Sequence, residues 1–237
     1  MPKLTAMLIV RNEAGRYLSR CLESLLRFVD NIVIIDDASE DDTPELCLSY
    51  PGVTLYRRAV PLFLSHEAEL RRELWQYTAA SKPEWILAID ADEFLEASAC
   101  QEIPYLLKQS YFKAIGFRLF DCWESEECFR SDGLWNPWLR GFSSYMVKYQ
   151  PQLEAAWPAL KFHCGRLPLA YRQLVHYESS IRIKHLGWAN PADIRFKYEQ
   201  ALGQDPANQY MAREHYESIL WPGEKIKTEP WLEQLSL

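Results

Sequence analysis

The sequence predicts an α/β domain with a mostly parallel central sheet, helices on both sides of it, and a helical C-terminal tail. Three observations lead to this prediction. Four short apolar runs in the first 90 residues are typical of buried strands. Amphipathic segments with helical spacing separate these runs, and such alternation is typical of βαβ units. From Pro191 onward the pattern is mainly helical.

The expected elements follow in order along the chain. The four buried strands are expected at 4–10, 31–35, 53–57 and 85–89. Helices are expected between them, at 14–29, from Thr43 and at 66–81. The second half is rich in aromatic residues, with further strands at 114–120 and 180–188 and helices from Pro191 to about Leu220.

Composition narrows the class of protein. The chain has 237 residues and a net charge of −7, which argues against a nucleic-acid partner because such partners bind basic surfaces. No apolar run approaches the roughly 20 residues that span a bilayer, so we expect at most peripheral membrane association. The N-terminus has no export signal and the six cysteines form no C-x-x-C pair, which favours a cytoplasmic protein with reduced thiols.

Polar residues follow three of the four predicted strands. In a parallel sheet these strand ends gather along one edge, where ligands bind. The residues are Asn12 and Glu13, Asp36 and Asp37, and the D-x-D pair Asp90 and Asp92. A lone D-x-D is more often a solvated acidic turn, but the three strand ends together favour a site. Carboxylates of this kind hold Mg²⁺ or Mn²⁺ together with substrate phosphates.

Three stretches in this order resemble the inverting family-two glycosyltransferases of GT-A fold, in their compact bacterial form. They are "LIVRNEAGRYLSRCLESLL", "VDNIVIIDDASEDDTPEL" and "WILAIDADEFLE"; "IKHLGW" resembles a later histidine position of that family. The resemblance implies one GT-A domain over 1–237. Within it, residues 1–96 would bind the nucleotide sugar, 97–190 would bind the acceptor, and 191–237 would form the helical tail.

The resemblance also implies roles for single residues at the metal. Asp92 would ligate Mn²⁺ or Mg²⁺, and Asp90 would lie near the ribose or a metal-bound water. His185 would contact the metal or the diphosphate as a neutral imidazole, with Arg182 and Lys184 adding positive charge that suits a diphosphate. The alternative is that His185 is structural.

At the nucleotide, the resemblance places a second group of residues. Asp37 would accept a hydrogen bond from the base, usually uracil, or form only an Asx-turn. A basic residue, Arg71 or else Arg72, would lie beside the base or phosphates, unless it is a surface cation. The first loop would line the nucleotide through Val10, Asn12 and Glu13.

The catalytic base is the least defined part of the predicted site. Compact relatives often have a His-Glu pair before the late histidine, whereas this chain has His163 followed by Cys164. Inversion needs a carboxylate to take the acceptor's proton, and Asp121 and Asp132 are the nearest candidates, although either could cap a turn. Trp123, Trp135 and Trp138 could stack on a sugar or belong to the core.

The sequence therefore predicts a metal-dependent inverting glycosyltransferase. The expected donor is a nucleotide diphosphate sugar, with UDP favoured, and the expected acceptor is a glycan, a lipid-linked intermediate or a protein. The alternatives are a sugar-phosphate nucleotidyltransferase, against which the single Gly15 of "VRNEAGR" counts, and a degenerate module that binds a nucleotide or glycan without turnover.

Overall fold

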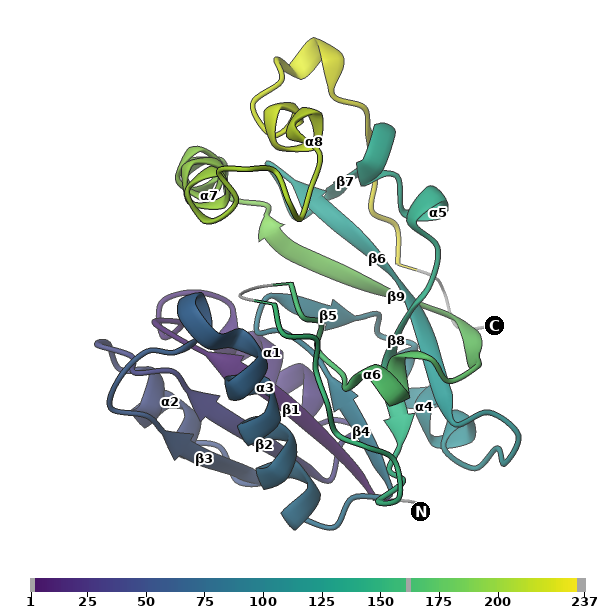
Figure 1. Cartoon of the computed structure of the whole chain (residues 1–237). Coiled ribbons are helices and arrows are strands. Elements are labelled where there is room, and N and C mark those ends of the chain that lie inside the picture. Colours follow the sequence, from purple (N-terminus) through teal and green to yellow (C-terminus); the bar gives the residue numbers. More distant parts are fainter. Residues whose placement is uncertain (1–2, 161–162, 234–237) are drawn as a thin grey trace.

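The computed structural model describes residues 3–160 and 163–233, in which helices and strands alternate up to the fourth strand (Figure 1). The first half consists of β1 (Leu4–Val10), α1 (Leu18–Leu25), β2 (Asn31–Asp36), α2 (Thr43–Leu48), β3 (Val53–Arg57), α3 (Phe63–Ala80), β4 (Trp85–Ala88), β5 (Glu93–Leu95) and α4 (Ala99–Leu106). The second half consists of β6 (Ala114–Trp123), β7 (Cys128–Arg130), α5 (Pro137–Arg140), β8 (Ser143–Lys148), α6 (Leu169–Arg172), β9 (His176–Trp188), α7 (Pro191–Gln204), α8 (Arg213–Ser218) and β10 (Thr228–Pro230).

The four predicted strands of the first half are confirmed, and they pair in parallel. β1 lies between β2 and β4, and β3 extends the sheet beyond β2. Side chains of β1 alternate between two cores: Leu4 and Leu8 pack with Leu22 of α1, whereas Met7 packs with Leu74 of α3. Because both faces are covered by helices, these strands consist of continuous apolar runs.

The sheet as a whole is mixed, so the prediction of a mostly parallel sheet is wrong. β8 is antiparallel to both β4 and β6, while β6 and β9 are parallel. Parallel neighbours need a crossover connection, usually a helix. Beyond β4 the chain adds strands without the regular helix-strand alternation, and the strand order becomes β10-β7-β6-β8-β4-β1-β2-β3.

The C-terminal tail is helical only in part. α7 and α8 are present as predicted, but β10 follows them and pairs antiparallel with β7. The indole of Trp231, next to β10, packs with Phe120 and Phe129. The tail therefore completes the second half of the molecule, where β6, β9, α7 and α8 lie together in Figure 1.

β9 is the strand that connects the two halves at the predicted site. It pairs antiparallel with β5, which follows the D-x-D directly, and the register places Glu93 opposite His185. The backbone N–H of Leu186 donates to the carbonyl of Asp92 at 2.8 Å. This pairing brings the late histidine to the D-x-D across more than 90 residues of sequence.

Candidate active site

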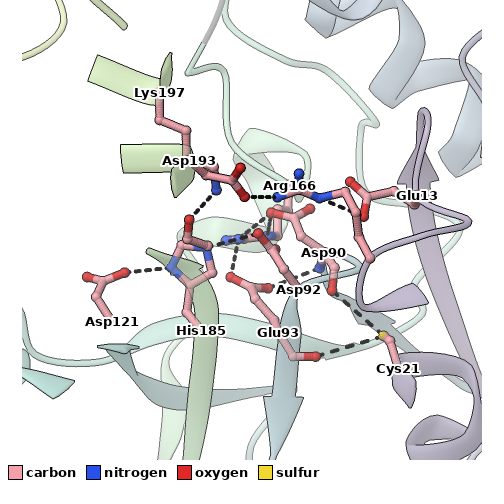
Figure 2. A network of polar contacts seen from close by, with 12 residues as sticks. Glu13, Cys21, Asp90, Asp92, Glu93, Asp121, Arg166, His185, Asp193 and Lys197 are labelled. Carbon is pink, nitrogen blue, oxygen red and sulfur yellow. Dashed lines mark hydrogen bonds and ion pairs between the residues drawn. The ribbon is translucent and has the colours of Figure 1, made fainter. Parts of the chain in front are cut away.

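Asp92, His185 and Asp121 form a continuous polar chain beside the end of β4. His185 Nδ1 lies 2.5 Å from Asp121 Oδ1, and its Nε2 lies 3.5 Å from Asp92 Oδ2. Figure 2 shows the imidazole between the two carboxylates. Arg140 of α5 adds an ion pair of 2.7 Å to Asp121. The structure thus brings three residues predicted for the site into direct contact.

The charges in this chain depend on one another. Burial lowers the pKa of His185, but Asp92 and Asp121 outweigh it and raise the pKa to about 10. Burial raises the pKa of Asp92 and of Asp121, but the contact with His185 outweighs it and leaves both pKa values below the ordinary range. Without a bound cation, the two carboxylates thus favour the protonated imidazole, and the role of His185 as a neutral ligand stays a prediction.

Gly187 leaves the room that this arrangement needs. A Cβ atom at this position would lie 2.4 Å from His185 Nε2 and 3.0 Å from Asp92 Oδ2. Contacts this short are not tolerated, so a larger residue at position 187 would displace the imidazole or the carboxylate. The absence of a side chain at Gly187 thus leaves the space in which His185 and Asp92 meet.

The other aspartate of the D-x-D is held by arginines. Arg166 donates to Asp90 Oδ2 through Nη2 at 2.6 Å and also pairs with the buried Glu93. Burial raises the pKa of Asp90, but Arg166 and Arg71 outweigh it and lower the pKa overall. For Glu93, burial dominates over Arg166 and raises the pKa to about 7. Asp90 is therefore an ionised carboxylate at neutral pH, held in place by Arg166.

Arg71 is buried rather than on the surface, and its Nη1 lies 4.0 Å from Asp90 Oδ1. Its Nε donates to Glu67 Oε1 at 3.0 Å, one helical turn earlier in α3. Arg72, the alternative, is exposed. The structure thus places the guanidinium of Arg71 next to the D-x-D, and its contact with a nucleotide stays a prediction.

The first loop follows β1 and is tied to the loop after β2. Val10 is buried, and Asn12 Oδ1 accepts from the backbone N–H of Glu40 at 2.8 Å. The Thr43 hydroxyl accepts from the backbone N–H of Glu13 at 2.7 Å. Burial raises the pKa of Glu13 to about 7, although the nearby Arg16 lowers it. These bonds fix the loop, and its contact with a nucleotide stays a prediction.

Asp37 already has a role inside the protein. Its side chain is fully buried, and its two oxygens accept from the backbone N–H groups of Leu62 and Phe63 at 2.8 and 2.9 Å. These bonds hold the start of α3. A cavity of about 460 Å³ lies nearby, lined by Ser39, Arg57 and Pro61 among others. Base recognition by Asp37 stays a prediction, beside this established structural role.

Asp132 makes its contacts with other residues than Asp92, His185 and Asp121. Both of its oxygens accept from the buried guanidinium of Arg130 at 2.9 Å, and one also accepts from the backbone N–H of Lys227. It lines a different cavity together with Trp135 and Trp221. Asp132 therefore fixes the tail to the second half of the molecule.

The positive charge near His185 comes from other residues than the sequence suggested. Arg182 pairs with Glu96 and lies over the Trp231 ring at 4.1 Å, and Lys184 faces the same ring at 5.6 Å. Alternate residues of a strand point to opposite faces, so neither is aligned with His185. Lys197 of α7 lies at the site instead and donates to the carbonyl of Gly187 (Figure 2).

Sequence reasoning missed Arg166, Lys197 and Arg140. Arg166 follows "HCG" in an irregular segment, and Lys197 lies among several charged residues of a helix. Neither position carries a periodic pattern that marks it. The only available signal for Arg166 was the need of Asp90 and the buried Glu93 for a compensating cation, because buried carboxylates require partners.

The donor set at Asp92 and His185 fits a hard divalent cation only in part. A carboxylate oxygen and an imidazole nitrogen that face each other are suitable ligands for Mn²⁺. Across residues 3–160 and 163–233, however, no three His, Cys, Asp or Glu side chains form a complete metal-binding set. A substrate diphosphate would have to supply further oxygens, as it commonly does for Mg²⁺.

The fold and these contacts can now be compared with known proteins. The family model described as "Glycosyl transferase family 2" matches residues 5–159, about two thirds of the chain. The chain belongs to glycosyl transferase family 2. This match covers β1 to β8 with the D-x-D, and it sets aside the nucleotidyltransferase alternative.

Individual relatives agree with this family. An uncharacterized protein of Mycobacterium tuberculosis is 27% identical over 216 residues, which is 86% of this chain and 51% of that protein. An uncharacterized glycosyltransferase of Rickettsia felis is 29% identical over 106 residues, 45% of this chain and 34% of that protein. The chain thus spans about half or less of the length of these curated relatives.

Among solved structures, S. aureus TarS matches 92% of this chain and 42% of its own, with a TM-score of 0.55 and 15% identity. This likeness concerns the fold and supports the α/β, GT-A-like architecture. TarS residues 1–349 have also been solved in complex with UDP, a match with a TM-score of 0.48. No helix in the described parts of the chain is long and apolar enough to cross a membrane.

Proposed function

We propose that this chain transfers a sugar, with inversion, from a nucleotide diphosphate donor to an acceptor, in a reaction that depends on Mn²⁺ or Mg²⁺. UDP is the donor nucleotide that the family resemblance favours. The observation that supports the proposal most is the convergence of Asp92, which lies between β4 and β5, with His185 of β9. The acceptor is a carbohydrate, a lipid-linked intermediate or a protein.

Asp92 and His185 would hold the cation, which would offset the charge of the diphosphate leaving group. Asp121 orients His185 through Nδ1, as the second partner of a metal-binding histidine commonly does. Lys197 and Arg16 add positive charge near Asp92. Arg16 forms ion pairs with Glu13 and Asp193, and Lys197 lies close to the same two carboxylates. Asp90, held by Arg166, would lie beside the ribose or a metal-bound water.

Of the two candidates for the catalytic base, the geometry favours Asp121. It contacts His185 and so lies one side chain from Asp92, whereas Asp132 is bound by Arg130 and lines a different cavity. Asp121 is almost fully buried, so an acceptor hydroxyl would have to reach it from the side of His185. Asp132 stays the second candidate.

The test is turnover of a panel of nucleotide sugars in the presence of Mn²⁺ or of a chelator. We expect release of the nucleoside diphosphate with UDP sugars and Mn²⁺ only. Asp92→Asn should reduce turnover by at least about 100-fold, since a bound cation contributes several kcal/mol to the transition state. Asp42→Asn is the control, because Asp42 is exposed and its side chain makes no capping hydrogen bond to α2. Equal UDP affinity with Mn²⁺ and with chelator would refute the metal dependence.

A further inference from the structure

A third cavity is connected to the D-x-D through Arg166, which lines the cavity and binds Asp90. It has a volume of about 310 Å³ and is lined by residues from the start of β8, from the segment around Arg166 and from the start of β9. The guanidinium that lines this cavity also binds Asp90 and Glu93. A group bound in the cavity would therefore be one side chain away from the donor-binding aspartate.

The charged lining of this cavity is entirely basic. Arg166, Arg172 and His176 line it, and no carboxylate does so among the described residues, in a protein whose net charge is −7. Arg166 is neutralised by its two carboxylates, so Arg172 provides the uncompensated charge. Arg172 donates to the carbonyl of Cys164 at 3.0 Å and has no carboxylate partner in the described part of the chain.

Glycines and a hydroxyl lie beside Arg172 and His176. A Cβ on Gly165 would lie 2.8 Å from Arg172 Nη1, and one on Gly116 would lie 2.6 Å from His176 Cδ2. Both side chains thus pack closely against glycines. Ser144 Oγ is 3.2 Å from His176 Nδ1 and adds a further polar group. Guanidinium and hydroxyl groups in this arrangement are the groups that bind phosphate or carboxylate.

An aromatic cavity adjoins the basic one through Phe142, which lines both. It has a volume of about 390 Å³, and Trp138 and Tyr177 line it. The Trp138 and Tyr177 side chains are 51% and 41% exposed, far more than core aromatic residues. Such exposed rings offer apolar faces against which sugar rings pack, with Phe142 held in place by Arg118 at 4.2 Å.

From these two cavities we infer that the acceptor is an acidic carbohydrate, whose phosphate or carboxylate binds Arg172 in the basic cavity while a neighbouring sugar packs on Trp138. The inference rests on the proposed function and specifies its acceptor. It explains why the basic cavity begins at Arg166, next to the donor site, and why exposed aromatic residues continue from it. It assigns roles to Arg172, Ser144 and Trp138, which the donor site does not use.

The test measures binding directly by NMR of the histidine rings, with the signal of His176 assigned from His176→Gln. Glucose 6-phosphate, glucuronate and glucose are titrated into protein saturated with UDP and Mg²⁺, so that the probes do not occupy the diphosphate site. We expect the His176 signal to shift with one or both acidic sugars and not with glucose. A response to glucose 6-phosphate alone identifies a phosphate site, and a response to glucuronate alone identifies a carboxylate site.

Variants show whether Arg172 is responsible. Arg172→Gln should weaken binding of the acidic sugar about ten-fold or more, since a hydrogen bond to a charged group is lost. Arg172→Lys should retain part of the affinity, and Arg195→Gln, an exposed arginine of α7, should leave it unchanged. An unaltered melting temperature confirms that the variants fold. Equal shifts with glucose, no shift with any probe, or undiminished binding by Arg172→Gln would refute the inference.

The same titration without UDP separates this inference from the proposed function. If the protein neither binds UDP nor consumes nucleotide sugars, yet the His176 signal responds to an acidic sugar, the donor assignment fails and the acidic site stands. If UDP binds and is affected by Mn²⁺ while no acidic sugar binds, the acidic acceptor fails and the transferase assignment stands.

Discussion

The two halves of the molecule position their functional side chains differently. In residues 4–96, Glu13 and the D-x-D residues directly follow parallel strands whose sequences are continuous apolar runs. In residues 110–232, Asp121 and His185 lie near the ends of the long strands β6 and β9. Arg166 lies in an irregular segment, and Lys197 lies in α7. The donor side is thus encoded by short local stretches, and the opposite side by contacts between distant segments.

This difference shows where the site is most sensitive to change. At the D-x-D, carboxylates of the first half interact with basic side chains of the second: Asp90 with Arg166, and Asp92 with His185. Toward the edge of the site the signs are reversed, since Arg16 of the first half pairs with Asp193 of the second. Removing a basic residue leaves buried carboxylates without compensation, whereas the carboxylates themselves are placed by the sheet. Three substitutions test this view, in order of decreasing expected effect.

The largest effect on stability is expected for Arg166→Gln. Asp90 would then keep only the more distant Arg71, and the buried Glu93 would lose its ion pair; breaking a buried ion pair costs about 3–5 kcal/mol. We expect about 3 kcal/mol in urea unfolding, because the Arg166 side chain is 27% exposed. The double variant with Glu93→Gln should recover part of this loss. If the two single losses simply add, the link between the halves does not stabilise the protein.

A smaller effect is expected for Asp37→Asn, within the first half. The amide has one acceptor oxygen for the backbone N–H groups of Leu62 and Phe63, so about 1 kcal/mol of stability should be lost, as for a helix cap. The same variant tests base recognition through the dissociation constant of UDP. A loss of affinity of about ten-fold or more supports the predicted contact with the base. An unchanged constant, alongside the lower stability, would make Asp37 a structural residue only.

The sequence indicated the first half well because the physical signal there is local. A strand covered by helices on both faces must be apolar throughout, and β1, β2 and β4 carry that pattern. The apolar pattern does not give the direction of the later strands: "AIGFRLF" forms β6, which is antiparallel to β8 and parallel to β9. Whether such a strand runs parallel or antiparallel depends on its connection and partners, which the pattern does not contain.

The candidate site shows the same limit. Asp90, Asp92 and His185 could be found because they stand at the ends of recognisable strands and motifs. Arg182 and Lys184 were given a role at the site because they are near His185 in sequence, but strand alternation turns them toward Trp231. Arg166 could be found only once Asp90 and Glu93 were known to share a partly buried environment.

The smallest of the three effects concerns the tail of the second half, where Asp205 ends α7. Its carboxylate accepts from the backbone N–H groups of Gln209 and Tyr210 at 2.6 and 3.0 Å and from the Tyr216 hydroxyl at 2.9 Å. Burial raises the pKa of Asp205, but these hydrogen bonds outweigh it and lower the pKa overall. Asp205→Asn should therefore lower the melting temperature by a few degrees at pH 7.

The pH dependence separates the Asp205 charge from simple packing of the tail. Because the folded-state pKa is lowered, the stabilisation is fully present above the unfolded value of about 3.9 and is lost as the pH falls through the folded value. The difference in melting temperature between wild type and Asp205→Asn should thus be constant from pH 7 to 5 and shrink below about pH 4. Glu199→Gln, an exposed carboxylate of α7, should show no such difference. A gap between wild type and Asp205→Asn that persists in acid would show that the shape of the side chain, rather than its charge, holds the tail.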